Sequence, residues 1–113
     1  MNWKIPKNIN RYVEETLTRE SGDIPEEQIT AGKWILDELD LEFIKVNQKM
    51  IGRHDEDPLH IKRKLDFMDS IKRGIPIYPL ILLGKNLFLV DGYARYRALK
   101  ELDIKKVKVI RQI

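Results

Sequence analysis

The sequence contains no cysteine among its 113 residues. This absence excludes disulfide frameworks, thiolate zinc sites, redox pairs and cysteine nucleophiles. Long apolar runs are also missing, since a segment such as residues 80–83 is far too short to span a bilayer. Residues 1–6 lack the apolar core of a signal peptide. We therefore expect a soluble, cytoplasmic protein that does not associate with membranes.

Charge is distributed unevenly along the chain, whose total is +3. Residues 1–40 hold 5 Lys/Arg and 9 Asp/Glu, a net charge of −4, and we call this segment the acidic leader. Residues 41–113 hold 16 Lys/Arg and 9 Asp/Glu, a net charge of +7. Charged residues make up 35% of the chain, a balance common in thermophile proteins. A basic body behind an acidic leader indicates that the body meets an anion.

The hydrophobic share of 42% is enough for the core of one small domain. In the acidic leader, apolar residues recur every four positions from Ile9 to Leu17, which predicts a helix over 7–20. A second helix is expected from a cap at Asp23 to about Leu39. We therefore expect residues 1–40 to be a two-helix extension in front of a domain at 41–113.

The pattern of apolar residues, prolines and glycines in the body predicts a mixed α/β (α+β) fold. The expected elements are a strand at 41–46, a polar loop at 47–58, a helix at 58–73, strands at 80–83 and 87–90 joined by a hairpin loop at 84–86, a helix at 93–102 and a last strand at 106–110. Together they predict a small mixed sheet with flanking helices.

The most informative motif is VDGYARYRA at residues 90–98, where a buried strand is expected to turn into a helix. The first N–H groups of a helix have no partner inside it and lie at the positive end of its dipole, which suits an anion. Gly92 allows close approach, and Arg95 and Arg97 add donors that fit phosphate. Asp91 could hold a metal ion, orient an arginine or accept a proton. The alternative is an ordinary turn with Asp91 as helix cap and solvated arginines.

Residues 41–113 resemble the ParB/sulfiredoxin superfamily, in the order of their elements and in this motif. ParB proteins have Gly-Glu-Arg-Arg at the turn, free serine kinases have Asp-Gly-His-His-Arg, and sulfiredoxins have Gly-Cys-His-Arg. Because the superfamily binds nucleotide phosphates at this turn, the resemblance implies phosphate contacts from Gly92, Tyr93, Ala94, Arg95 and Arg97. It implies a nucleotide-side wall at Gly74, Ile75 and Pro76. Asp91 matches the kinase-like aspartate, a candidate base or Mg²⁺ ligand.

The chain departs from each of these groups. The missing cysteine excludes sulfiredoxin chemistry. Tyr93 and Ala94 replace the two histidines of the kinase-like motif, and Gln48, where the kinases carry a glutamate, cannot act as a general base. The sequence lacks the helix-turn-helix and dimerisation domain of a complete partition protein. We therefore expect a stand-alone, single-domain relative.

Other segments offer weaker candidates. Arg53, in the expected polar loop, is a candidate phosphate contact. Residues 54–57 (HDED) have metal-ligand types, but consecutive residues seldom converge on one ion, which favours a solvated acidic loop. The basic faces of the 58–73 helix could bind DNA through electrostatic attraction, and the alternative is an ordinary soluble protein surface. The acidic leader either completes the core or forms a dimer or cover surface.

Three function classes follow from these observations. The first is a nucleotide-phosphate-binding protein, with ATP, ADP or CTP and Mg²⁺ as ligands, acting as an NTP hydrolase or phosphotransferase. The second is a DNA-binding or nuclease-like module that uses the basic body. The third is a non-catalytic regulatory or interaction module that retains the fold. If the leader forms a dimer surface, the expected partner is a second copy of the chain in a homodimer.

Overall fold

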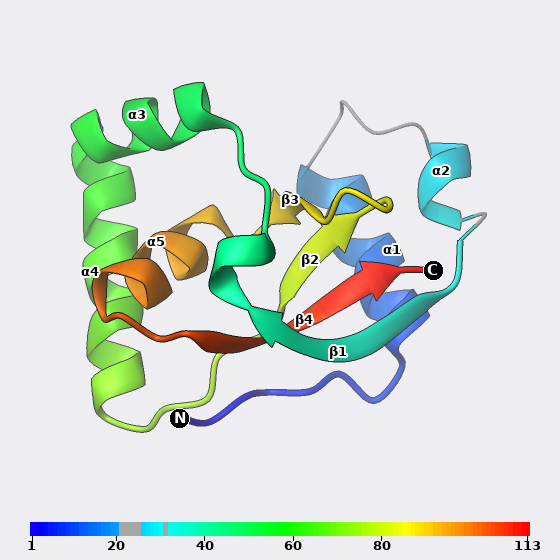
Figure 1. The fold of residues 1–113 in the computed structure, drawn as a ribbon, viewed down its shortest axis with the longest axis horizontal. Coiled ribbons are helices and arrows are strands. Elements are labelled where there is room, and N and C mark those ends of the chain that lie inside the picture. The colour runs from blue at the N-terminus through cyan, green and yellow to red at the C-terminus, as the bar shows by residue number, and fades with distance from the viewer. Residues whose placement is uncertain (21–25, 31) are drawn as a thin grey trace.

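The computed structural model describes residues 1–20, 26–30 and 32–113. Its helices and strands confirm the mixed α+β class (Figure 1). In chain order they are α1 (Ile9–Glu20), α2 (Glu26–Thr30), β1 (Trp34–Asp40), the short 3₁₀ helix η1 (Leu41–Phe43), α3 (Gln48–Glu56), α4 (Pro58–Lys72), β2 (Leu80–Leu83), β3 (Phe88–Asp91), α5 (Tyr93–Glu101) and β4 (Lys106–Gln112).

The four strands form one sheet in the order β1-β4-β2-β3. β4 runs antiparallel to β1 and parallel to β2, and β2 and β3 are the antiparallel hairpin that the sequence predicts. The last strand of the chain therefore lies between the first strand and the hairpin.

Both faces of the sheet are buried. Successive side chains of a strand point to opposite faces, and each face packs against a helix. Leu80 and Leu82 pack with Leu99 of α5 on one face, whereas Ile81 packs with Val13 and Leu17 of α1 on the other. All of these side chains are fully buried. In Figure 1, α3 and α4 stand together at one end of the molecule and α1 and α2 at the other.

The predicted helix at 23–39 is wrong over its second half. Residues 34–40 are β1, which pairs along its whole length with β4, from Trp34 opposite Gln112 to Asp40 opposite Lys106. Ladder hydrogen bonds to a distant strand outweigh the helix-like spacing of the leucines. The expected cap at Asp23 lies outside the described residues. The division into 1–40 and 41–113 stays a prediction. In the structure, β1 from the first segment is an edge strand of the same sheet as the strands of the second segment.

Two further expectations in the body are wrong. Residues 41–46 are not a strand, because the chain turns through η1 and only Lys45 bridges to Phe88 of β3. The expected loop at 47–58 contains α3, which begins where the Asn47 side chain accepts hydrogen bonds from the N–H groups of Lys49 and Met50. Because no residue of α3 is buried, the helix needs no regular apolar stripe, and the sequence therefore gives no clear helical pattern there.

The other expected elements of the body are confirmed as α4, β2, β3, α5 and β4. The predicted helix at 7–20 corresponds to α1, whose buried residues pack on the sheet. Over the described parts of the chain, no helix is both long and apolar enough to cross a membrane.

Candidate functional site

A cleft of about 1000 Å³ opens where β3 runs into α5. Its floor is the strand–helix turn at residues 88–95. One wall comes from Lys4, Tyr12 and Thr16 of the acidic leader, and the facing wall from α3 and α4. Residues 76–78, just before β2, close a third side. Segments from four parts of the chain therefore enclose the expected site.

Gly92 makes the sharp turn at the floor of the cleft. It is the N-cap of α5 and has a left-handed φ of 103°. A Cβ atom at this position would lie 2.8 Å from Leu80 Cδ2 and 3.0 Å from Arg95 Nη2, so only glycine fits. The Tyr96 N–H donates to the Gly92 carbonyl at 2.8 Å. The amides of residues 93–95 precede this first intrahelical bond and lie at the positive end of the helix.

Arg95 and Asp91 form a buried ion pair beside the turn. Each residue is 8% exposed, and Arg95 Nη2 donates to Asp91 Oδ2 at 2.6 Å. Arg95 Nη1 also donates to the carbonyls of Tyr78 and Pro79, at 2.9 and 3.0 Å. Asp91 thus orients an arginine, one of the three roles considered above. The reading with Asp91 as cap and a solvated Arg95 is wrong, because Gly92 is the cap and Arg95 is buried.

Arg97 points away from the cleft and ties α5 to the α3–α4 pair. It is 5% exposed, its Nε donates to Asp55 Oδ1 at 2.9 Å, and its Nη1 donates to the His60 carbonyl at 3.2 Å. The solvated reading is therefore also wrong for Arg97. Its partners make it a link between helices, and its predicted contact with phosphate stays a prediction.

The leader wall is held in place by backbone pairing. Trp3 forms an isolated parallel bridge with Ile77, in which the Lys4 N–H donates to the Ile77 carbonyl at 2.8 Å. Lys4 Nζ lies 5.1 Å from the centre of the Tyr78 ring, and that ring stacks on Tyr12 with centres 5.0 Å apart. Burial raises the pKa of Tyr12, and the neighbouring Arg95 opposes this shift. A cation and two aromatic rings thus face the floor.

The facing wall carries a pair of histidines. The rings of His54 and His60 stack with centres 3.8 Å apart, and His54 meets the Tyr93 ring edge-on. Burial lowers the pKa of His54, as do the nearby His60 and Arg97. Tyr93 is fixed in turn, because its hydroxyl donates to the Leu89 carbonyl and accepts from the Asn47 N–H. This wall therefore presents two stacked imidazole rings beside the ring of Tyr93.

The cleft favours an anion on electrostatic grounds. Lys4, Arg63 and Arg95 line it, whereas Asp91 is the only carboxylate among the described residues of the lining. That carboxylate is already paired with Arg95. Two cations and the amide end of α5 are left without a compensating acid in the lining.

Comparisons with known proteins bear on the fold. No family model matches the chain, and neither does any curated protein. Solved structures do match, among them a Pnob8-like ParB-N domain in its C2221 crystal form and a pNOB8-like ParB N-domain. The TM-scores are 0.56 and 0.54, and each match is 23% identical over 72% of this chain.

The chain has a ParB-like fold. This confirms the fold expected from the resemblance in sequence. The match spans only 30% and 28% of the two solved chains, so the ParB-like fold is what the likeness establishes.

Within this ParB-like fold, the predicted site residues divide into two groups. Those that line the cleft are Pro76, Asp91, Gly92, Tyr93, Ala94 and Arg95. Those that do not are Gly74, Ile75, Arg97 and Arg53, the last of which is exposed on α3. The predicted roles of both groups in ligand binding, and of Asp91 in catalysis or metal binding, stay predictions.

Six residues of the cleft wall with a cationic side chain or a polar ring were not among the predicted phosphate contacts. They are Lys4, Tyr12, His54, His60, Arg63 and Tyr78. Most of them come from segments that the sequence treats as leader, loop or exposed helix face. The sequence offered two signals for them, namely the leader as a cover surface and His54 among the metal-ligand types of residues 54–57.

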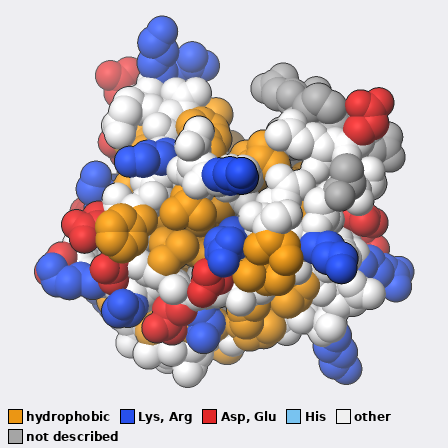
Figure 2. Space-filling view, turned by 45° about the vertical axis from the view of Figure 1, so that its right-hand side comes forward, with side chains coloured by type: hydrophobic (Ala, Val, Ile, Leu, Met, Phe, Trp, Pro, Cys, Tyr) orange, Lys and Arg blue, Asp and Glu red, His pale blue; other side chains and the backbone are white. Residues whose placement is uncertain are grey.

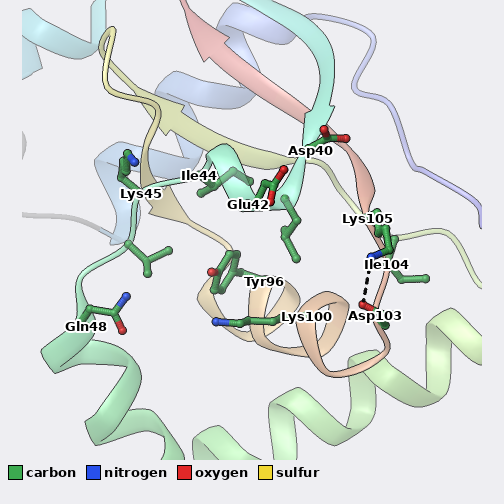
Figure 3. Close-up of a pocket in the computed structure, with 12 residues that line it drawn as sticks. Asp40, Glu42, Ile44, Lys45, Gln48, Tyr96, Lys100, Asp103, Ile104 and Lys105 are labelled. Atoms are coloured by element: carbon green, nitrogen blue, oxygen red, sulfur yellow. Dashed lines mark ion pairs between the residues drawn. The ribbon is translucent and has the colours of Figure 1, made fainter.

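A second cavity, of about 630 Å³, lies between η1 and the end of α5 (Figure 3). Gln48, which the resemblance in sequence places at the position of the kinase glutamate, lines this cavity and not the cleft. Glu42 and Asp40 share it with Lys100, Lys45 and an Asp103–Lys105 ion pair. Its charges of both signs give it no preference for an anion.

Three of the five basic residues at 58–73 form ion pairs with acidic side chains. Ion pairs join Lys62 to Asp66, Arg73 to Asp69 and Lys64 to Glu101 of α5. The face of the molecule in Figure 2 likewise intersperses Lys and Arg with Asp and Glu around central hydrophobic side chains. These ion pairs reduce the positive charge that α4 offers to DNA but leave an excess of it, so DNA binding by this surface stays a prediction. Among the described residues, no group of three or more His, Asp or Glu could hold a metal ion.

Proposed function

We propose that this ParB-like chain binds a nucleotide in the cleft, with its phosphates at the amide end of α5. The observation that carries the proposal is the charge of the lining. Lys4 and Arg63 line the same cleft as the first turn of α5, and the one carboxylate among the described residues of the lining, Asp91, is paired with Arg95. Phosphate groups are the ligand type that such an arrangement of amides and cations favours.

The proposal is for binding without turnover. Asp91, the candidate base, is buried and hydrogen-bonded to Arg95 at 2.6 Å, so its carboxylate already serves a structural partner. The kinase-like histidines are replaced by Tyr93 and Ala94, and Gln48 lies in the other cavity. These features favour the regulatory class over an NTP hydrolase or phosphotransferase.

Calorimetric titration with ATP, ADP and CTP, each with and without Mg²⁺, tests the proposal. The sharpest variant is Ala94→Glu, because a glutamate in the first turn suits the helix dipole but repels a phosphate there. We expect the wild type to bind and Ala94→Glu to lose at least about tenfold in affinity. The neutral Ala94→Gln is the matched control for side-chain size.

Two results would contradict the proposal. Wild-type protein that binds none of the three nucleotides contradicts the binding itself. Release of phosphate from a bound nucleotide, abolished by Asp91→Asn in protein that still folds, contradicts the absence of turnover.

A further inference from the structure

The acidic leader contributes a polar edge of α1 to the cleft. Tyr12 and Thr16 are four residues apart, so they lie on the same side of the helix, and both line the cleft. The residues that follow each of them, Val13 and Leu17, are fully buried against the sheet. One side of α1 is thus anchored in the core while the neighbouring side presents two hydroxyl groups to the site.

The position of this edge is fixed by contacts outside the cleft. Asn10 accepts a hydrogen bond from the Trp34 N–H at 3.0 Å, which joins α1 to β1. The Tyr12 ring stacks on Tyr78, and the angle between the two planes is 19°. Because Val13, Leu17 and the ring are all packed, the hydroxyls are held in place before any ligand arrives. Pre-organised donors cost little to order on binding.

Both hydroxyls lie beside the cationic floor of the cleft. Tyr12 and Thr16 line the same cleft as Asp91 and Arg95, and the charge of Arg95 opposes the effect of burial on the pKa of Tyr12. The first turn of α5, which we propose as the phosphate site, borders the same space. A phosphate oxygen placed there would meet donors from α5 below and from α1 at the side.

We propose that Tyr12 and Thr16 donate hydrogen bonds to the phosphate groups of the bound nucleotide, so that α1 is part of the binding site. This inference rests on the proposed function. It assigns a ligand-binding role to the acidic leader, which lies outside the region of sequence resemblance. It also implies that a bound nucleotide stabilises the docking of α1 on the sheet.

The test combines calorimetry with hydrogen exchange on the full chain. Tyr12→Phe keeps the stacked ring and Thr16→Val keeps the branched shape, so each removes only a hydroxyl. Loss of a hydrogen bond to a charged group should weaken nucleotide binding about tenfold for each variant. Exchange of the amides of residues 9–20 should slow when nucleotide saturates the wild type, and should slow less in the variants.

Thr18→Val is the matched control, because Thr18 is exposed on α1 and its hydroxyl donates to the Glu14 carbonyl. It should bind nucleotide as the wild type does. If the wild type binds nucleotide and both Tyr12→Phe and Thr16→Val bind it equally well, this inference is wrong while the proposed function stands. If the wild type binds no nucleotide, both are wrong.

Discussion

The arginines of α5 and the basic residues of α4 look alike in sequence but differ in surroundings. Asp91–Arg95 and Asp69–Arg73 are both ion pairs four residues apart. The α5 pair has side chains 8–10% exposed, with a 2.6 Å contact, whereas the α4 pair is about two-thirds exposed, with a 3.4 Å contact. The comparison teaches that spacing creates such pairs, while burial decides what they contribute to stability.

The largest expected effect is that of removing the buried partner. Asp91→Ala leaves the Arg95 charge buried without a counter-charge, so we expect the free energy of unfolding to fall by about 3–5 kcal/mol. Urea denaturation followed by circular dichroism measures it. Asp69→Ala is the matched control on α4 and should cost less than about 1 kcal/mol. Equal losses of unfolding free energy in the two variants would contradict the claim that burial makes the Asp91–Arg95 pair more important than the Asp69–Arg73 pair.

Removal of the Arg97 side chain should cause the second-largest loss in the free energy of unfolding. Arg97→Ala removes hydrogen bonds to Asp55 and to the His60 carbonyl, and we expect a loss of about 1.5–3 kcal/mol because the arginine is buried. Asp55 is 55% exposed and can turn to water, which limits the cost. Arg97→Lys should restore little of the loss, since lysine lacks the planar fork. Full restoration by lysine would show that charge alone matters here.

A smaller effect concerns the histidine beside Arg97. Because the pKa of His54 is lowered in the folded state, the unfolded chain binds more protons as the pH falls below about 6.5, and folding stability decreases there. We expect less than about 1 kcal/mol of loss from this group between pH 7.5 and 5.5, since the ring is only partly buried. His54→Gln should flatten the stability profile in that window. An unchanged slope would refute this assignment.

The smallest effect belongs to the α4 surface. Lys62 and Asp66 have side chains 74% and 67% exposed, so a double-mutant cycle with Lys62→Ala and Asp66→Ala should give a coupling below about 0.5 kcal/mol. Added salt should reduce the coupling further. A coupling near 2 kcal/mol would show that exposure does not separate the two helices.

Much of the body could be predicted from sequence because its signals are local. The apolar runs of β2 and β3, the Gly92 turn and the stripe of α4 each lie within a few residues of one another. The same holds for Asp91 and Arg95, four residues apart at the start of a helix. The clustering of residues 91–95 with Pro76 in one cleft follows from these elements.

The remaining parts depend on contacts between distant residues. β1 reads as a helix because its strand character comes from pairing with β4, and the leader wall exists because Tyr12 meets Tyr78. The burial of Arg97 likewise depends on Asp55, on another helix. Contacts between residues so far apart in the chain produce no regular spacing that a single sequence would reveal.

The place of β4 between β1 and β2 has a consequence for how the chain acquires its structure. β1 leaves the ribosome well before the strand that it pairs with, residues 106–112, because the hairpin and helices α3 to α5 are made in between. Until β4 is available, β1 and the hairpin share no ladder, and the apolar faces of α1 and α5 have no complete sheet to cover. Closing loops of this length makes assembly slow and cooperative, and β1 lacks its partner strand until β4 has been made.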